Sequence, residues 1–246
     1  MTPKHSMNTA ICLAGTGTAI EHTFQNLKEC LIDNIDNSDV IVYLAKNPHS
    51  DNAQNYFLQL SNSCVSVVEE ETLSIKPYRF KEGFPPSPNS SREIFMQMLK
   101  SKSHLNTLID QNEKHLNKKY DRVIFSRMDV KYEQPIKESV DRLDLSKLWL
   151  PNFHNWCEGY NDRFAVSSRE NMRHYFSVYD YVDTYTKERH CFHAETTLKY
   201  HLDKKGVDIG IFELYFSRVR SGGLPHESYE RIKTQAMRPC TGTDEY

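Results

Sequence analysis

The sequence of 246 residues has neither the long apolar runs nor the cysteine spacings that define several classes of protein. No apolar run approaches the roughly 20 residues that a membrane-spanning helix needs. The first residues also lack the long apolar stretch of a secretory signal. The six cysteines are scattered without a CxxC pair, which is the spacing of neither a zinc module nor a disulfide scaffold. We therefore expect an intracellular protein with reduced thiols and no membrane span.

An excess of charge of one sign is also missing. The formal net charge is −2, the isoelectric point is about 6.6 and the mean hydropathy is −0.67. A chain without a basic field has no electrostatic reason to bind nucleic acid. We therefore expect no nucleic-acid partner.

Three common catalytic motifs are absent as well. "GTGTAI", which begins at Gly15, matches neither the dinucleotide fingerprint G-x-G-x-x-G nor the P-loop pattern G-x-x-x-x-G-K-[ST]. No G-x-S-x-G elbow occurs, which removes the usual signature of a serine hydrolase.

Short apolar runs alternate with helical patterns along the chain. Phe24, Leu27, Leu31 and Ile35 recur at helical spacing, and Asp51 stands where it could cap the next helix. The expected strands cover residues 9–15, 39–45, 64–68, 122–126 and 148–151. This alternation is typical of an α/β domain with a mostly parallel sheet, and the length fits one such domain over residues 1–246.

Two capping boxes predict further helices. Ser90-x-x-Glu93 opens a long helix, and Ser167-x-x-Glu170 opens a helix with an aromatic stripe over residues 172–185. The helical spacing of that stripe favours a place in the core over a ligand platform.

The remaining segments are one helix over residues 193–202, one or two strands over 207–219, and three irregular stretches. Residues 74–89 contain four prolines and a glycine, which exclude a continuous helix, so this stretch is either a lid loop or a plain surface loop. Residues 1–8 and about 221–246 are expected to be loose.

Charged residues follow the apolar runs. In "YDRVIFSRMDVKY", residues 120–132, an arginine and an aspartate end a buried strand, although removing either charge from water is costly. The full set of such charged residues is Arg127, Asp129, Asp162, Arg163, His193 and Glu195. Each has a structural alternative, such as an Arg127–Asp129 pair that closes a loop. Together, at the edges of one sheet, they indicate a site for a phosphorylated ligand.

The order of these segments resembles nucleotide-sugar-dependent glycosyltransferases of the GT-A fold, especially small bacterial and viral enzymes of glycan synthesis. The resemblance extends over residues 9–212 and is carried by "ICLAGTGTAIEHTFQNLKECL", "DVIVYLA", "YDRVIFSRMDVKYEQPI", "GYNDRFAVSSRENMRHY" and "HAETTLKYHL". It implies a GT-A-like, Rossmann-like fold with a mostly parallel central sheet flanked by helices. It also implies transfer of a hexosyl or pentosyl group from a UDP- or GDP-sugar to a glycan or other hydroxyl acceptor. The location implied is cytoplasmic, in the host cytoplasm if the enzyme is viral.

The resemblance includes one departure. In the family an acidic D-x-D motif ends a central strand and holds a divalent cation against the donor diphosphate, but here Arg127 stands at the first acidic position and only Asp129 matches. One reading is that the guanidinium binds the diphosphate and replaces part of the charge of the cation. The other is that Asp129 holds Mn²⁺ or Mg²⁺ with a later histidine such as His226.

The resemblance also assigns the remaining site residues. Arg163 is expected beside the donor, and Asp162 or Glu195 as the general base that takes the proton of the acceptor hydroxyl. For Glu195 a role at the start of its helix stays open. The residues expected to contact the nucleoside are Ala14, Gly15 and Thr16.

Two alternatives accompany this reading. A non-catalytic nucleotide-sugar or carbohydrate-binding module could use the same fold, since fold does not determine function. A different nucleotide-using enzyme, such as a nucleotidyltransferase, is the third reading. The sequence leaves the sugar, the acceptor, the oligomeric state and the choice between inversion and retention open.

Overall fold

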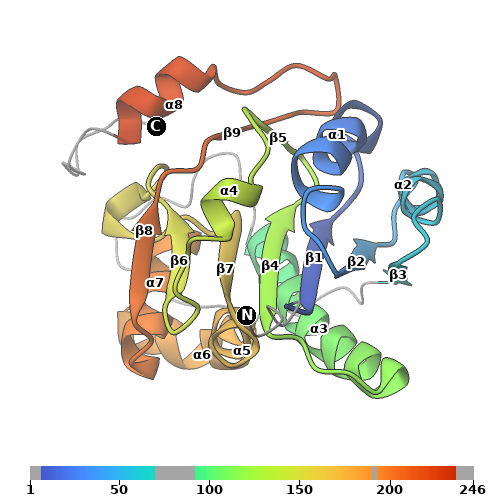
Figure 1. Ribbon diagram of the computed structural model, residues 1–246. Coiled ribbons are helices and arrows are strands. Elements are labelled where there is room, and N and C mark those ends of the chain that lie inside the picture. Colours follow the sequence, from blue (N-terminus) through green and yellow to red (C-terminus); the bar gives the residue numbers. More distant parts are fainter. Residues whose placement is uncertain (1–6, 70–91, 190–192, 237–246) are drawn as a thin grey trace, which may run out of the picture.

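The computed structural model describes residues 7–69, 92–189 and 193–236, and its centre is a seven-stranded sheet in the order β3-β2-β1-β4-β7-β6-β8 (Figure 1). The strands of this sheet are β1 (Thr9–Gly15), β2 (Ser38–Ala45), β3 (Ser63–Val68), β4 (Arg122–Arg127), β6 (Leu148–Pro151), β7 (Phe164–Ser168) and β8 (Ile209–Phe212). β1 pairs in parallel with both β2 and β4, and β2 with β3. Among the described strands of the sheet, only β7 runs antiparallel to its neighbours. The expected α/β fold class with a mostly parallel central sheet is confirmed.

Side chains of the central strands alternate between two apolar layers, because successive residues of a strand point to opposite faces. Ile11 and Leu13 of β1 pack into one layer with Val42 of β2. Cys12 and Tyr43 pack into the other. Both faces of these strands are buried, which explains why β1 and β2 are continuous apolar runs in the sequence.

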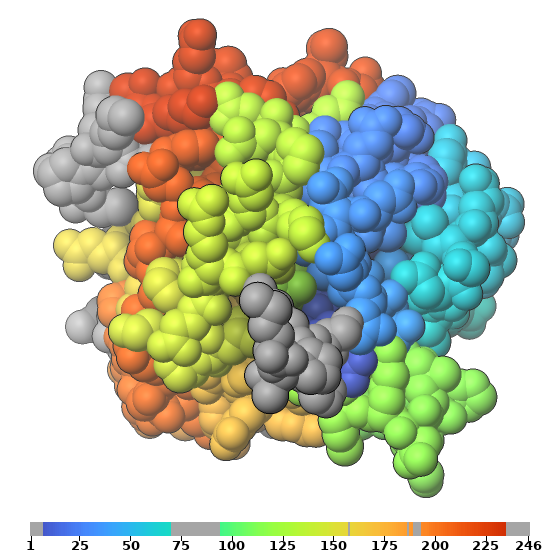
Figure 2. All heavy atoms as spheres, viewed as in Figure 1, coloured from blue at the N-terminus to red at the C-terminus, as the bar shows by residue number. Residues whose placement is uncertain are grey.

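Helices cover both faces of the sheet. One layer contains α1 (Ile20–Leu27), its π-helical continuation (Lys28–Ile32), α2 (Ser50–Phe57) and α4 (Lys137–Val140). The other layer contains α3 (Arg92–Leu116), α5 (Arg169–Phe176), α6 (Val178–Arg189) and α7 (Ala194–Lys205). In Figure 2 the surface of the N-terminal segments (blue) meets that of the segments around α4 (yellow-green). The backbone joins them there, since the Ile136 amide donates a hydrogen bond to the Cys30 carbonyl at 3.0 Å.

The chain changes direction across the sheet between β1 and β4. From β1 it proceeds to β2 and β3 on one side, and α3 then carries it back to β4 on the other side of β1. In an open α/β sheet, the connections on the two sides of such a point diverge and leave a crevice outside the carboxyl ends of the strands. The topology therefore places a binding crevice at the ends of β1 and β4.

A two-stranded ribbon lies at the carboxyl end of β4 (Figure 1). Its strands are β5 (Val130–Tyr132) and β9 (Phe216–Arg218), which pair antiparallel. The Val219 amide donates a hydrogen bond to the Asp129 carbonyl at 2.8 Å, so the C-terminal segment is held against the residues that follow β4. The last described helix is α8 (Tyr229–Ala236), and a short 3₁₀ turn (Trp156–Glu158) precedes β7.

The five strands expected up to residue 151 are confirmed, and residues 207–219 form two strands, β8 and β9. The sequence analysis missed β7, because its five residues follow a polar loop and give too short a pattern to identify. The helix expected to include Ile35 ends at Ile32. The single helix expected over residues 172–185 is two helices, α5 and α6, which part at Ser177.

Two expected helix caps are wrong by a short distance. The cap of α5 is Ser168, whose hydroxyl accepts a backbone hydrogen bond. Ser167, the residue expected there, instead donates its hydroxyl to the Lys147 carbonyl at 2.7 Å. Asp51 lies in the first turn of α2 and pairs with Lys46 at 2.6 Å.

Some expectations fall partly or wholly outside the described residues. The candidate lid at 74–89 and the capping residue Ser90 are not among them. The segment from Ser221, expected to be loose, contains α8. Within the described ranges, no helix combines the length and the apolar character that crossing a membrane requires.

A pair of glycines gives a test of the loop after β1. Gly17 has φ +73° and an added Cβ would lie 2.4 Å from the Ala53 Cβ, whereas Gly206 has φ +65° and an added Cβ meets nothing within 4 Å. Gly206→Ala should therefore cost only the left-handed backbone, about 1 kcal/mol. Gly17→Ala should cost about 2–4 kcal/mol, because overpacking is added. Urea unfolding of both variants measures this, and equal losses would contradict the packing of α2 against this loop.

Candidate functional site

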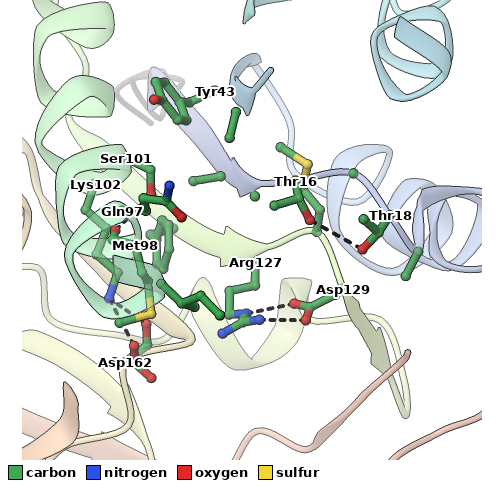
Figure 3. A pocket seen from close by; sticks show the side chains of 18 residues that line it. Thr16, Thr18, Tyr43, Gln97, Met98, Ser101, Lys102, Arg127, Asp129 and Asp162 are labelled. Atoms are coloured by element: carbon green, nitrogen blue, oxygen red, sulfur yellow. Dashed lines mark hydrogen bonds and ion pairs between the residues drawn. The ribbon is translucent and has the colours of Figure 1, made fainter. Parts of the chain in front are cut away.

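A cavity of about 260 Å³ lies at the carboxyl ends of β1 and β4, where the topology places a crevice (Figure 3). Its walls come from the ends of β1, β2 and β4, from the loop after β1, and from the first turns of α3. Of the residues predicted from the sequence, the cavity is lined by Ala14, Gly15, Thr16, Arg127, Asp129 and Asp162. Arg163, Glu195 and His226 do not line it.

The end of β1 contributes small residues to the wall of the cavity. The Thr16 carbonyl accepts a hydrogen bond from the Asn47 side chain at 2.8 Å, which ties this turn to the end of β2. Tyr43 of β2 lines the cavity towards α3 and stacks on His104 of that helix, with ring centroids 5.3 Å apart and planes 10° apart. Small residues and flat rings let a planar ligand approach the backbone closely.

One stripe of α3 forms the opposite wall, and the sequence analysis missed it. The residues of this stripe are Ile94, Gln97, Met98, Ser101 and Lys102. Their spacing of i, i+3, i+4, i+7 and i+8 places them on one face of a helix. The signal was available in the sequence, since three polar residues share this helical face with apolar ones. The polar residues are Gln97, Ser101 and Lys102.

Lys102 is the most deeply placed cation of the site, with 2% of its surface exposed. Its ammonium donates to the Asp162 carbonyl at 2.8 Å and lies 3.5 Å from the Asp162 carboxylate. It also lies over the rings of Phe125 and Tyr175, at 5.2 and 4.9 Å from their centroids. Burial lowers the pKa of Lys102, and the Asp162 carboxylate opposes that effect.

Asp162 is the anion of this pair, with 2% of its surface exposed. Burial by itself would raise its pKa, but Lys102, Arg163 and Arg127 together hold the pKa well below its usual value. Asp162 is thus strongly stabilised as a carboxylate. Figure 3 shows Lys102 and Asp162 together at one end of the cavity, with Arg127 and Asp129 beside them.

Arg127 and Asp129 form a bidentate pair, as one sequence reading expected. The guanidinium donates to both carboxylate oxygens of Asp129, Nε at 2.7 Å and Nη2 at 2.6 Å. Burial opposes the ionisation of Arg127, but Asp129 raises its pKa overall. Burial likewise disfavours the Asp129 carboxylate, but Arg127, Arg218 and Arg163 lower its pKa overall.

Arg163 joins this part of the site to α7. Its Nη1 lies 3.1 Å from Glu195 Oε1 and 3.5 Å from Asp162 Oδ1. Glu195 is in the first turn of α7, but the helix is capped by His193, whose ring accepts from the Thr196 amide. Glu195 is therefore a buried partner of Arg163, with 4% of its surface exposed, and not the cap of its helix.

Arg218 was not predicted from the sequence. It ends β9, opposite Val130, and burial together with Arg163 and Arg127 lowers its pKa to about 10. Nearby, the His226 amide donates to the Arg218 carbonyl at 2.6 Å, and the His226 side chain is 43% exposed. His226 thus lies on the same segment as Arg218 but not on the cavity wall.

The residues present do not make a divalent-cation site. Both carboxylate oxygens of Asp129 already accept from Arg127. In the part of the chain that the structure describes, no group of three or more histidine, cysteine, aspartate or glutamate side chains could hold a metal ion. What the arrangement offers is a set of buried, fixed cations at a strand edge, which is suited to a phosphate or a developing negative charge.

The model of a protein family described as "Domain of unknown function (DUF7796)" matches residues 4–224, so the chain belongs to that family. No curated protein matches the sequence. Among solved structures, the apo-form glycosyltransferase GlyE of Streptococcus pneumoniae TIGR4 matches at 12% identity and a TM-score of 0.48. That match covers 82% of this chain but only 45% of GlyE, so the chain spans less than half of that protein.

A second solved structure is a "Putative Glucose-1-Phosphate Thymidylyltransferase" from Bacillus anthracis in complex with a sucrose. It matches at 12% identity and a TM-score of 0.45, over 96% of this chain and 98% of that chain. Likenesses of this size do not bear on the chemistry, which depends on the site itself.

Removing the buried lysine tests the electrostatics of the cavity. Asp162 has a lowered pKa in the folded state, so it contributes stability that is present above about pH 4 and is lost as the pH falls further. Lys102→Met leaves that carboxylate without the cation that lowers its pKa most, and should cost about 3–5 kcal/mol at pH 7. The loss should shrink towards pH 3, because a protonated Asp162 no longer needs the cation.

Urea unfolding at pH 7, 5, 4 and 3 measures this effect. Lys114→Met on the exposed side of the same helix is the matched control and should change stability by less than about 0.5 kcal/mol. A loss for Lys102→Met that does not depend on pH would show that packing, and not charge, accounts for it.

Proposed function

We propose that the protein is a glycosyltransferase that moves a hexosyl or pentosyl group from a nucleotide-diphosphate-sugar to a glycan or other hydroxyl acceptor. The observation that carries this proposal is the two-part character of the cavity. One part is lined by small residues and an aromatic ring at the end of β1 and β2, and the other by Lys102, Arg127, Asp129 and Asp162. A nucleotide sugar has the same division, with a flat base at one end and a charged, hydroxyl-rich portion at the other.

The donor would lie along the carboxyl edge of the sheet. Its base would lie against Gly15 and Thr16, small residues that let it approach the backbone, and its diphosphate beside Arg127. The sugar would then reach the Lys102–Asp162 end, where a carboxylate can accept and an ammonium can donate hydrogen bonds to its hydroxyls.

The transfer itself needs two forms of assistance. The acceptor oxygen bonds to the anomeric carbon while the bond from that carbon to the phosphate oxygen breaks, so negative charge develops on the leaving diphosphate. Fixed guanidinium groups beside that oxygen would stabilise the charge. The proton of the acceptor hydroxyl must pass to a base, and the two carboxylates proposed for that role are Glu195 and Asp162.

These two carboxylates are not equivalent. Asp162 lines the cavity, but Lys102, Arg163 and Arg127 stabilise its charged form, and a strongly stabilised carboxylate is a weak base. Glu195 lies on the far side of Arg163, so it would serve an acceptor that approaches from the α7 side. Whether the anomeric configuration inverts depends on the face from which the acceptor oxygen attacks the anomeric carbon relative to the leaving diphosphate.

A non-catalytic binding module is the second candidate, and one observation favours it. Asp129, Asp162 and Glu195 are each within ion-pair distance of a cation. A protein that only binds a nucleotide sugar needs such an arrangement and needs no base.

A panel of nucleotide sugars tests whether the protein binds a donor. UDP-, GDP- and CMP-sugars at 1 mM should each be tested for a rise in melting temperature, since a ligand that binds only the folded state stabilises it. We expect a UDP- or GDP-sugar to raise the melting temperature and a CMP-sugar, which has a single phosphate, to have a smaller effect. If no nucleotide sugar changes it, the proposal is wrong, and slow hydrolysis of the active donor would distinguish an enzyme from a binding module.

Amide variants of the two carboxylates test catalysis. Loss of a general base should lower kcat roughly 10²- to 10⁴-fold, with little change in donor affinity, because the base acts on the acceptor. Glu195→Gln and Asp162→Asn should be compared with Glu170→Gln, an exposed position on α5. Transfer assays and donor titrations on all three provide the measurement. Wild-type turnover by both site variants would remove both carboxylates from the role of base.

A further inference from the structure

Three arginines from separate parts of the chain act on the Asp129 carboxylate at the cavity wall. Arg127 ends β4, Arg163 precedes β7, and Arg218 ends β9. Backbone hydrogen bonds fix their relative positions: the Arg127 amide donates to the Arg163 carbonyl at 3.1 Å, and the Val219 amide to the Asp129 carbonyl at 2.8 Å. We call Arg127, Arg163 and Arg218 the arginine cluster.

Positive charge exceeds negative charge in this network. The arginine cluster and Lys102 supply four cations, and the carboxylates that interact with them are Asp129, Asp162 and Glu195. Asp162 is shared between Lys102 and Arg163, and Asp129 accepts both of its hydrogen bonds from Arg127. Among the residues that the structure describes, these carboxylates are one fewer than the cations of the network.

Arg163 shows that the network is incomplete. Only 9% of this residue is exposed, yet its buried Nε and Nη1 atoms donate no hydrogen bond to any residue that the structure describes, although Nη1 lies close to Glu195. A buried guanidinium normally satisfies its donors, because leaving them unpaired costs free energy. Burial and its two arginine neighbours also lower the pKa of Arg218. An anion placed among the three would relieve both.

A divalent cation is the wrong ion for this position. Asp129, the residue that matches the metal-binding motif, is bound in the fork of Arg127. A metal held there would also lie among Arg127, Arg163 and Arg218, the three cations that already stabilise the Asp129 carboxylate. Like charges at short range repel in a poorly hydrated site, so these residues favour a phosphate and disfavour Mn²⁺ or Mg²⁺.

Resting on the proposed function, we propose that the arginine cluster binds the diphosphate of the donor directly and that no divalent metal is needed. Guanidinium groups bind phosphate oxygens in a bidentate fashion and stay charged at any relevant pH. In the ligand-free state Asp129 occupies the fork of Arg127, and a phosphate would compete with it for that fork. The ligand class is a nucleoside diphosphate or the diphosphate part of its sugar ester.

Calorimetric titration of UDP and GDP in 1 mM EDTA and in 1 mM MnCl₂ tests this proposal. We expect the better nucleotide to bind in EDTA with a Kd within about threefold of that in manganese. Arg218→Gln should weaken binding at least tenfold in both buffers, whereas Arg218→Lys, which keeps the charge, should weaken it less. Arg142→Gln, at an exposed position on the loop after α4, is the matched control and should bind as the wild type does. Melting curves confirm that each variant is folded.

Asp129→Asn distinguishes binding of the diphosphate by the arginine cluster from binding through a metal held by Asp129, because the two mechanisms predict opposite changes in nucleotide affinity. If the arginine cluster binds the diphosphate, freeing Arg127 from its carboxylate should leave binding in EDTA unchanged or make it tighter. If Asp129 holds a metal, the same change should abolish binding in manganese. Binding that requires manganese in the wild type, or is lost in Asp129→Asn, would overturn this inference and leave the proposed function in place. Failure of every nucleoside diphosphate in both buffers would overturn both. Tight binding in EDTA without any turnover would support the cluster and refute the transferase.

Discussion

The cost of taking charge out of water governs the carboxyl edge of this sheet. Lys102, Asp162 and Glu195 each expose 4% of their surface or less, and such groups persist only when each is close to an opposite charge. Their pairing therefore dictates the local architecture. The Lys102–Asp162 pair holds α3 against the loop before β7, and the Arg163–Glu195 pair holds that loop against α7. The walls of the cavity are thus joined by the charges that would contact a ligand.

The sequence predicts the strands well because the sheet is buried on both faces. A strand that is buried on both faces has a continuous run of apolar residues in its sequence, and β1, β2 and β4 all contain such a run. β7 has it too, in "FAVSS", but its antiparallel place between β4 and β6 depends on partners distant in sequence. The caps were missed by one or two residues because several adjacent polar residues could each have served, and only packing decides among them.

The same reasoning separates the parts of the site that could be predicted from those that could not. Arg127 and Asp129 are two residues apart at a strand end, so their pairing follows from local geometry. Lys102 and Asp162 are 60 residues apart, and Arg218 reaches the cluster only because β9 pairs with β5. No spacing rule connects such residues. A lysine on the core-facing side of a helix nevertheless indicates a nearby acidic residue, since burying that charge is costly unless it is paired.

Stability alone does not account for the charges at this edge. A buried ion pair contributes little to folding compared with apolar residues of the same volume, because desolvation offsets most of the attraction. In the part of the chain that the structure describes, the four cations of this network outnumber its three carboxylates, and such a surplus of positive charge is less favourable still. The Arg127–Asp129 pair suits a site that must remain folded when empty, because the carboxylate satisfies the guanidinium until an anion replaces it. The affinity for such an anion then depends on the difference in free energy between the Arg127–anion pair and the Arg127–Asp129 pair. The carboxylate that stabilises Arg127 therefore also weakens the binding of the anion.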